Sequence, residues 1–353
     1  MLDSAMRKIR ITCIGSGWVV SNRHIPVLSR NSKYQIVAIA GRQEGKLSRL
    51  AQEYKIQKFF TDDATRNAVW LDSCDAVMIG SDPFHHYELA KFCLQNGKHV
   101  LMEKPFTTSF TESTELVSLA ESAKVQFAIV HNMQFSRAVK RLDEDIRKGL
   151  IGNVKGLTAF QLGNHRRRLP TWYDELPWGL YFDESPHLLY LLRKYGKELT
   201  LRNAVKYDST RGLNTPALVT ANFETAIRVP ASLYLNFEAP VSEWFLIVHG
   251  EEQIGAVDVF RDIYFRLPND EGHKALDILN TSRHAIVGHL RGTFASGLRV
   301  LNRNMFYGFE EVIDLFAESI LNNRSLSAIA ASEALKTNYL QFELINQATV
   351  VKT

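Results

Sequence analysis

The sequence predicts an α/β protein of two domains, a doubly wound parallel sheet followed by an α+β domain with an antiparallel sheet. The chain has 353 residues, too many for one ordinary hydrophobic core. Over the first 130 residues, short apolar runs alternate with amphipathic helical segments, as in a parallel sheet covered on both faces. From about residue 217 to 266, apolar and polar residues alternate, as in an antiparallel sheet with one solvated face.

Each element of the first domain follows from its residue pattern. Continuous apolar runs predict strands over 8–14, 35–40, 75–79, 99–102 and 125–130. Apolar residues three and four positions apart predict helices from a glycine-rich turn to about Ser29 and over 46–53, 84–96 and 111–123.

The pattern changes near residues 131–135, so we divide the chain into a first domain of residues 7–131 and a second of residues 132–353. In the second domain, helices are predicted over about 137–148, from about 183 onward, and over 308–321 and 331–347. Strands are predicted over 217–223, 228–237, 244–249 and 255–260.

Composition and charge restrict the class of protein. The residues are 45% hydrophobic and 23% charged, the balance of a soluble globular protein. Lys and Arg number 42 against 38 Asp and Glu, and the net charge of +4 does not by itself indicate nucleic-acid binding. No apolar run is long enough to span a membrane, and the first ten residues lack the apolar core of a signal peptide.

The three cysteines, Cys13, Cys74 and Cys93, lie far apart and lack the spacing of metal ligands. We therefore expect reduced core cysteines, a cytoplasmic protein and no metal site. We expect neither nucleic acid nor membrane as a partner.

A glycine-rich turn, Gly15-Ser16-Gly17, follows the first predicted strand and precedes a helix. Glycine permits a tight turn and lets backbone N–H groups approach a pyrophosphate. Val20 stands where the dinucleotide-binding fingerprint has its third small residue, and the alternative is an ordinary strand–helix turn. The place of the turn in a doubly wound pattern favours a nucleotide site.

The end of the second predicted strand bears on which nucleotide binds. An NAD site usually has an acidic residue here to accept from the ribose 2′-OH, but this chain has Gly41 and Arg42. Glycine leaves room for a 2′-phosphate, and a guanidinium can pair with it bidentately. We therefore favour NADP over NAD. The alternatives are a solvated Arg42, or a ribose contact from Gln43 or Glu44.

Lys104 follows the strand 99–102, between Glu103 and Pro105. The proline keeps Lys104 out of the helical backbone region, and a Lys–Pro bond can be cis. Beside a positively charged nicotinamide ring the ammonium form is disfavoured, which suits the lysine to proton transfer. The alternative is a lysine that only pairs with Glu103.

Asp183 and His187 are four residues apart, so a helix places them on one face. Pro186 fits within a first helical turn, which would put the pair at the start of the helix. A histidine held by a carboxylate can move a proton to or from a hydroxyl. The alternative is a helix cap beside an ordinary core histidine.

A basic and aromatic loop over 165–173 leads toward this helix. Arginines suit phosphate or carboxylate groups, and aromatic rings suit sugar or base faces. The loop therefore suggests an acidic substrate such as a sugar nucleotide or a sugar acid. The alternative is a solvated or subunit-contact loop. The candidate substrate contacts are Arg166, Arg168, Trp172 and Tyr173.

In chain order, these motifs resemble those of the glucose–fructose oxidoreductase, inositol dehydrogenase and MocA family (Gfo/Idh/MocA). The resemblance covers nearly the whole chain, and Glu103-Lys104-Pro105 is its most specific part. It also rests on His24 and on segments 81–86, 97–105, 131–135 and 149–154.

The resemblance implies an N-terminal Rossmann domain and a C-terminal domain with a large, mostly antiparallel sheet that often builds a dimer or tetramer interface. It implies hydride transfer between a nicotinamide and a hydroxyl or keto carbon of a sugar, sugar nucleotide or cyclitol, in a homodimer or homotetramer. Lys104 would then contact the reacting oxygen, and Asp183 and His187 would bind or deprotonate the same hydroxyl.

The cofactor contacts that the resemblance implies are Gly15, Gly17, Trp18, Val19, Arg42, Ser81, His86 and Glu103, to which we add Gly41 and Lys104. We also expect Asn132 to contact the substrate.

The chain departs from the family pattern in three places. Ser81-Asp82 replaces the usual Thr-Pro, His131 replaces the usual Tyr before Asn132, and bulky residues over 178–182 replace a glycine-rich lead into the Asp/His helix. These departures leave the substrate open. Two other functions also stay open, namely an enzyme that recycles tightly bound NAD(H) within a non-redox sugar reaction, and a non-catalytic nucleotide-sensing protein.

Overall fold

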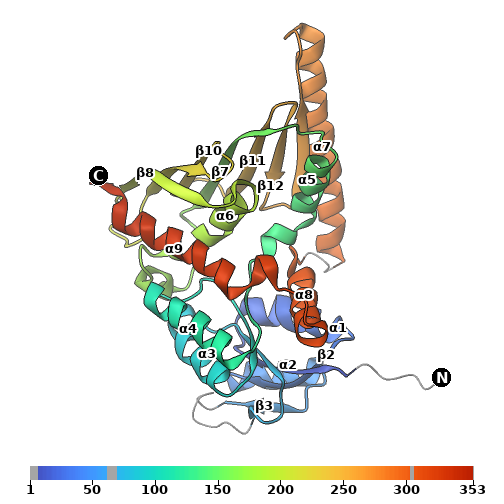
Figure 1. The fold of residues 1–353 in the computed structure, drawn as a ribbon, viewed down its shortest axis with the longest axis vertical. Coiled ribbons are helices and arrows are strands. Elements are labelled where there is room, and N and C mark those ends of the chain that lie inside the picture. Colours follow the sequence, from blue (N-terminus) through green and yellow to red (C-terminus); the bar gives the residue numbers. More distant parts are fainter. Residues whose placement is uncertain (1–6, 62–69, 303–305, 353) are drawn as a thin grey trace, which may run out of the picture. The chain divides into compact units, whose positions relative to one another are not determined.

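The computed structural model describes residues 7–61, 70–302 and 306–352, which form two compact units (Figure 1). The first unit comprises Met1–His131 and Phe309–Asn338, and the second comprises Asn132–Gly308 and Tyr339–Thr353. Residues 1–6, which were considered above for a signal peptide, lie outside the described residues.

The first unit is built on a six-stranded sheet in the order β3-β2-β1-β4-β5-β6, in which every neighbouring pair is parallel. The order reverses direction between β1 and β4, which is the switch point of a doubly wound fold. The strands are β1 (Ile9–Ile14), β2 (Tyr34–Ala40), β3 (Lys58–Phe60), β4 (Ala76–Ile79), β5 (His99–Met102) and β6 (Phe127–Ile129).

The helix after the glycine-rich turn begins as a π turn, because the ring nitrogen of Pro26 cannot donate a helical hydrogen bond. The short helices of this unit are η1 (Val20–His24), α1 (Ile25–Arg30), η3 (Pro83–His85) and η6 (Ser327–Ile329). The longer ones are α2 (Glu44–Glu53), α3 (His86–Gln95), α4 (Phe110–Ala123), α8 (Phe309–Asn322) and the start of α9 (Ala331–Gln347).

Helix α8 lies in the first unit, whereas the division made from the sequence placed its residues in the second domain. The Lys33 ammonium binds the carboxylates of Asp314 and Glu318, each at 2.6 Å. The Tyr34 hydroxyl donates to the Ile313 carbonyl at 2.7 Å. These contacts join residues far apart in the sequence, so local patterns do not reveal them.

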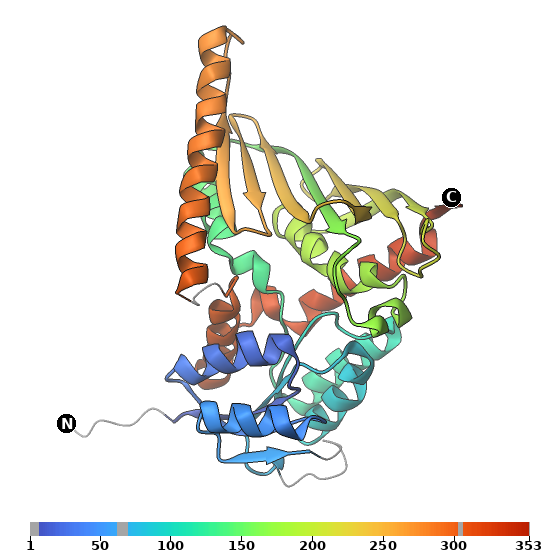
Figure 2. The same ribbon diagram turned by 180° about the vertical axis from the view of Figure 1, so that it is seen from behind.

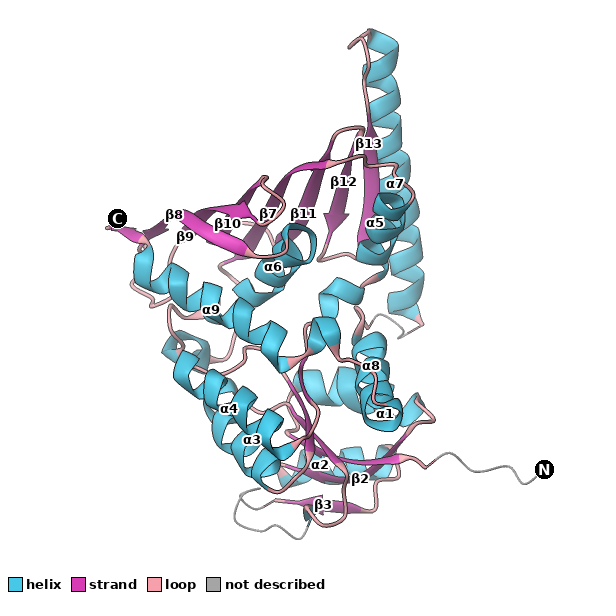
Figure 3. Cartoon of the chain, in the orientation of Figure 1, coloured by secondary structure: helices cyan, strands magenta, loops and turns pink. Residues whose placement is uncertain are grey.

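The second unit is built on an eight-stranded sheet in the order β13-β12-β11-β7-β10-β9-β8-β14 (Figure 3). Its pairs are antiparallel except β7 with β10 and β8 with β14, so the predicted fold class is confirmed for both sheets. The strands are β7 (Val154–Asn164), β8 (Leu199–Tyr207), β9 (Leu218–Thr225), β10 (Pro230–Ala239), β11 (Glu243–Gly250), β12 (Gln253–Asp258), β13 (Ile263–Pro268) and β14 (Thr349–Val351).

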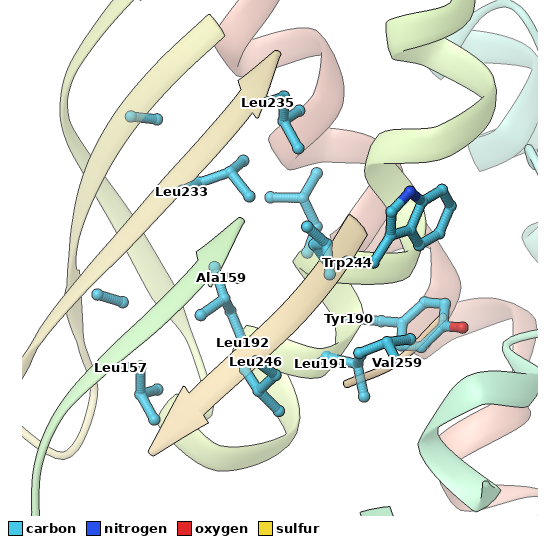
Figure 4. Close-up of a cluster of buried hydrophobic side chains, with 14 of the residues drawn as sticks. Leu157, Ala159, Tyr190, Leu191, Leu192, Leu233, Leu235, Trp244, Leu246 and Val259 are labelled. Atoms are coloured by element: carbon cyan, nitrogen blue, oxygen red, sulfur yellow. The ribbon is translucent and has the colours of Figure 1, made fainter. Parts of the chain in front are cut away.

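One face of this sheet forms the core of the second unit (Figure 4). Leu157 and Ala159 of β7 and Leu246 of β11 pack with Leu191 and Leu192 of one buried helix, α6. The helices of this unit are η4 (Asn132–Phe135), α5 (Arg137–Arg147), η5 (Thr171–Glu175), α6 (Leu180–Gly196), α7 (Ala275–Leu301) and the end of α9.

The helix that carries Asp183 and His187 begins earlier than predicted. Helix α6 starts at Leu180, so Pro186 lies inside the helix and the prediction that it stands in the first turn was wrong. Proline has no N–H and leaves the Phe182 carbonyl without its helical donor. Gln341 of α9 donates to that carbonyl at 2.8 Å, and this bond compensates for the proline.

Candidate active site

Two glycines meet where β1 and β4 end side by side. Gly15 has a φ angle of +110°, and a Cβ there would lie 2.5 Å from the Gly80 carbonyl oxygen. A Cβ on Gly80 would lie 2.4 Å from Cγ2 of the fully buried Val20. Valine therefore fits in place of the third small residue of the fingerprint because the neighbouring strand ends in glycine. Gly80 could have been recognised in the sequence as the glycine that ends the third predicted apolar run.

The rest of the turn is accessible. Gly17 is exposed, and within the described residues no atom lies within 4 Å of the position that its Cβ would take. Trp18 is 64% exposed, and the Arg23 guanidinium lies over its ring at 4.6 Å. Val19 is half-buried. The turn thus combines tight packing at Gly15 with the open backbone at Gly17 that a pyrophosphate needs.

Arg42 faces a carboxylate. Its Nη2 lies 2.9 Å from Oδ2 of Asp82, and Oδ1 of Asp82 lies 2.5 Å from Nδ1 of His85. Asp82 and Ser81 follow β4, whereas Gly41 and Arg42 follow β2. The departure from the family pattern at Asp82 therefore supplies a partner for the guanidinium that was expected to bind a 2′-phosphate.

Glu103 connects the strand before Lys104 to the π turn. Its Oε1 lies 2.7 Å from Nε2 of the fully buried His24, and its Oε2 accepts from the Lys104 N–H at 3.1 Å. A carboxylate only accepts hydrogen bonds, so Nε2 carries the proton. The His24 ring also packs edge-on against Phe309, with centroids 5.0 Å apart. His24 was one of the residues that carry the family resemblance, but no role was predicted for it from the sequence.

His86 holds the turn that contains Lys104. Its Nδ1 lies 2.9 Å from the Pro105 carbonyl oxygen and its Nε2 lies 3.3 Å from that of Ser81. Burial lowers the pKa of His86 and so disfavours the charged form of the ring. The Lys104–Pro105 peptide bond is cis. The residue expected to contact the cofactor thus directs both ring nitrogens to backbone carbonyls.

In the second unit, Asp183 and His187 are both buried on α6. Nδ1 of His187 lies 2.9 Å from the Tyr190 hydroxyl, which accepts from the Met133 N–H at 3.0 Å. The His187 ring also packs against Trp244, with centroids 5.4 Å apart. Tyr190 and Trp244 therefore fix the orientation of the histidine, a role that the sequence did not predict for either residue.

The basic loop divides between solvent and interior. Arg166 and Arg168 are exposed, whereas Arg167 between them binds the two carboxylate oxygens of Glu184 at 2.9 and 3.2 Å. Glu184 is buried, and Gln161 also donates to it. This bidentate pair joins the loop to α6 beside Asp183. The sequence analysis selected the neighbours of Arg167 and overlooked Arg167.

Two other predicted substrate contacts pack on each other, and a third binds backbone. The rings of Trp172 and Tyr173 stack with centroids 4.0 Å apart. The Asn132 side-chain amide donates to the Tyr307 carbonyl at 3.0 Å.

Each unit gathers its own candidate residues. The first holds the glycine turn, Arg42 and Lys104, and the second holds Asp183 and His187. Within the described part of the chain, no cluster of three or more His, Cys, Asp or Glu side chains could hold a metal ion. None of the described helices is long and apolar enough to cross a membrane.

Residues 9–131 match the profile of the Gfo/Idh/MocA family, described as an oxidoreductase family with an NAD-binding Rossmann fold. Over this region, the chain is similar to the Gfo/Idh/MocA oxidoreductase family. The matched residues include the glycine turn, Arg42, His86 and Lys104. The resemblance inferred from the motifs is confirmed.

Curated relatives of the chain include two named enzymes. The scyllo-inositol 2-dehydrogenase (NADP+) IolU of Bacillus subtilis is 29% identical over 151 residues, which are 43% of this chain and 44% of IolU. The dTDP-3,4-didehydro-2,6-dideoxy-α-D-glucose 3-reductase of Actinomadura kijaniata is 27% identical over 155 residues, 43% of this chain and 45% of that protein. The chain spans about half the length of the curated relatives it matches.

Solved structures share the fold over nearly the whole chain. The WlbA dehydrogenase from Bordetella pertussis, in complex with NADH and UDP-GlcNAcA, has a TM-score of 0.74 and 16% identity and covers 97% of both chains. A mutant of KijD10, a 3-ketoreductase from Actinomadura kijaniata in complex with TDP-benzene and NADP, has a TM-score of 0.75 and 17% identity, covering 98% of this chain and 100% of that one.

Proposed function

We propose that the chain is an NAD(P)-dependent oxidoreductase that transfers hydride between a nicotinamide and a hydroxyl or keto carbon of a sugar, sugar nucleotide or cyclitol. The observation that carries this proposal is the turn at the switch point of the first sheet. Gly15 and Gly80 leave no room there for side chains, and Gly17 is open. The match of residues 9–131 to an oxidoreductase family supports the reaction class.

The residues of the first unit fit a dinucleotide. The ends of β1, β2, β4 and β5 lie along one edge of the parallel sheet, so Gly15, Arg42, Ser81 and Lys104 all follow strands that end at that edge. When bound, the nicotinamide accepts or supplies the hydride. The backbone of the glycine turn would face the pyrophosphate, and Arg42 would face the adenosine ribose.

We assign the movement of the substrate proton to Lys104 in the first unit and to His187 in the second. Nδ1 of His187 lies 2.9 Å from the Tyr190 hydroxyl, a contact that holds the ring in one orientation. Asp183 would orient His187 or bind a substrate hydroxyl. The carboxylate of Glu103 accepts from the Lys104 N–H and so fixes the backbone from which the lysine acts.

NADP is the cofactor that Gly41 and Arg42 favour, and NAD is the alternative. A guanidinium that already faces Asp82 can exchange that carboxylate for a 2′-phosphate. The structural neighbours are of both kinds, since WlbA was solved with NADH and the KijD10 mutant with NADP.

For the substrate, we propose contacts from Arg166, Arg168, Trp172, Tyr173 and Asn132. The two arginines are exposed and suit an acidic group such as a sugar-nucleotide diphosphate or a sugar carboxylate.

We further propose that the protein is cytoplasmic and forms a homodimer or homotetramer. Its three cysteines are free and buried, as expected of a protein from a reducing compartment. The outer face of the second sheet carries the stacked rings of Phe160 and Phe245, with centroids 5.0 Å apart, and offers an apolar surface for a second copy.

A substrate screen tests this function. Sugar nucleotides, sugar acids and inositols are offered with NADP(H) and NAD(H), and turnover is read from the absorbance of the reduced nicotinamide. We expect turnover with a member of one of these classes and added NADP(H).

Two outcomes would contradict the proposal. Turnover that needs no added nucleotide, with NAD(H) that copurifies with the protein, would establish the internal-recycling enzyme instead. Tight nucleotide binding without turnover of any class, together with cellular function that survives Lys104→Ala, would establish the nucleotide sensor.

A further inference from the structure

Helix α7 packs closely on β13, an edge strand of the eight-stranded sheet (Figure 2). A Cβ on Gly288 would lie 2.6 Å from Cβ of Phe265, and a Cβ on Gly292 would lie 2.4 Å from Cγ2 of Ile263. One turn further along, Ser296 donates to the Asp262 carbonyl at 3.4 Å. Small residues four positions apart thus form the packed side of the helix.

The opposite side of α7 is apolar and exposed. At about 100° per residue, the positions half a turn away from Gly288, Gly292 and Ser296 form one continuous line along the helix. We call this line the α7 stripe, and its side chains are between 45% and 80% exposed. A surface helix of a globular protein normally directs polar residues outward, so α7 has the reverse arrangement. The stripe consists of Leu279, Ile286, Leu290, Phe294, Leu298 and Leu301.

We propose that the α7 stripe pairs with the α7 stripe of a second copy of this chain, the two helices running antiparallel about a two-fold axis. Two pairs of leucines lie at equal distances from the midpoint between Gly288 and His289, whereas Ile286 would face the exposed Arg291. Leu279 matches Leu298, and Leu276, which is 77% exposed, matches Leu301. A two-fold interface requires this kind of self-complementarity, because the same surface meets itself in reverse.

The exposed Arg283 also fits this pairing. It lies between Leu279 and Ile286 on the same side of the helix as the stripe, and it would fall opposite Phe294, which is 71% exposed. A guanidinium over an aromatic ring is an attractive contact. The charge of Arg283, beside the apolar residues of the stripe, would therefore meet a ring rather than another cation.

The area of the stripe is that of a protein–protein contact. With about 100 Å² exposed on each large side chain, the stripe and Leu276 present roughly 700 Å² per copy, close to the ~800 Å² per partner of a specific interface. Such an area exceeds the apolar patch that monomers usually leave exposed, which is at most about 300–600 Å².

Helix α7 also lies on the same face of the sheet as the stacked rings of Phe160 and Phe245. Helix α7 covers Ile263 of β13, and Ile263 is in register with Asp258 of β12. Across the next two strand pairs, Asp258 is in register with Phe245 and Phe245 with Phe160. These side chains project from one face of the sheet, and Tyr264, which alternates with them, bonds to Asp145 of α5 on the other face. The second copy would therefore approach from the side of the sheet that carries these rings.

A lipid surface is a less suitable occupant. Helices that lie on membranes carry a strongly charged face opposite their apolar face. The face of α7 opposite the stripe is instead packed on Ile263 and Phe265. This inference does not depend on the proposed enzymatic function, because it uses no residue assigned to catalysis or cofactor binding.

The mass of the full-length protein in solution tests the proposal. Sedimentation velocity over protein concentrations from nanomolar to high micromolar compares the wild type with a Leu290→Arg/Phe294→Arg variant. Both side chains are exposed, so the change should leave the fold intact, which circular dichroism checks. We expect the dissociation constant of the assembly to rise at least about 30-fold, the scale of one interface hot spot. The matched control is Thr293→Arg, exposed on the same helix but outside the stripe.

Disulfide trapping tests the antiparallel arrangement. The native cysteines are buried and give little background. A mixture of chains carrying Leu279→Cys or Leu298→Cys should form a mixed disulfide faster than either chain forms one with itself. Faster self-linking of each variant would show a parallel pair and overturn the proposed geometry.

The following outcomes would overturn the proposal itself. One is a wild-type protein that stays monomeric at high micromolar concentration, whether or not it binds anionic vesicles through α7. The other is an assembly whose dissociation constant is the same in the wild type and the Leu290→Arg/Phe294→Arg variant.

Discussion

Gly80→Ala forces a methyl group against Val20 behind the glycine turn. The new Cβ would lie 2.4 Å from Cγ2 of the valine, whereas carbon atoms normally pack about 3.5–4.0 Å apart. Val20 is fully buried, so it cannot move aside into solvent. Overpacking of this kind costs about 1–3 kcal/mol of unfolding free energy.

A second substitution should relieve this clash. Val20→Ala alone removes two buried methyl groups and costs about 1.6 kcal/mol. In the double variant, the alanine methyl at position 80 occupies part of the vacated space, so the two costs should not add. We expect the double variant to be more stable than additivity requires by about 1–3 kcal/mol. The affinity for NADPH should also recover in the double variant, since the clash behind the glycine turn is relieved.

Urea unfolding with and without NADPH measures this coupling. The transition that NADPH shifts to higher urea reports on the unit that binds it. The control pair combines Gly80→Ala with Val139→Ala, because Val139 is buried in α5 of the second unit. The effects of the control pair should add within about 0.5 kcal/mol. If the stability effects of Gly80→Ala and Val20→Ala also added within that limit, the packing explanation of the glycine turn would be refuted.

Three further predictions concern other contacts. Arg42→Asp should reduce or reverse a preference for NADPH over NADH. Asp82→Asn should strengthen NADPH binding up to about fivefold, because an exposed ion pair is worth ~1 kcal/mol or less. Calorimetric titration measures both affinities, and a wild type that prefers NADH would contradict this reasoning. Burial lowers the pKa of His86, so its contribution to stability is present above about pH 6.5 and is lost as the pH falls below it. Between pH 7 and pH 5 the wild type should lose up to about 2 kcal/mol more than His86→Gln, and equal losses in urea unfolding refute this. Gln341→Leu leaves the Phe182 carbonyl, which has no helical donor because of Pro186, without its hydrogen bond and should cost about 1–3 kcal/mol of unfolding free energy. Adding Pro186→Ala should recover part of that cost in thermal unfolding. No recovery would contradict the role of Gln341 in compensating for the proline.

Much of the fold could be predicted from local patterns. β5 and α9 begin and end at the predicted residues, because a short apolar run before proline and a long amphipathic repeat are both strong signals. Helix α7 was not predicted, since Gly288, Gly292 and Gly297 weaken a helical pattern. Two of these glycines bring the helix onto β13, and that tertiary reason is not visible in the sequence.

The candidate site was predictable where strand order determines it. Lys104 and Arg42 follow strands that end at the same edge of a parallel sheet, and the order of the motifs along the chain is enough to infer this. The roles of Tyr190, Asp82 and Arg167 depend on which side chain turns toward which partner. Adjacent residues of a basic loop look equivalent in a sequence, and only the structure distinguishes Arg167 from its neighbours.

The rate of hydride transfer in Lys104→Met tests the central claim most directly. It is measured as a single turnover with NADPH bound and the substrate that the screen identifies. We expect the rate to fall at least about a hundredfold, the scale of a general acid–base residue, while the dissociation constant for NADPH changes less than about threefold. Lys58→Met, which changes an exposed lysine of β3, should transfer hydride at the wild-type rate. A near-normal rate in Lys104→Met would remove this lysine from the mechanism and contradict the proposed function of the turn that carries it.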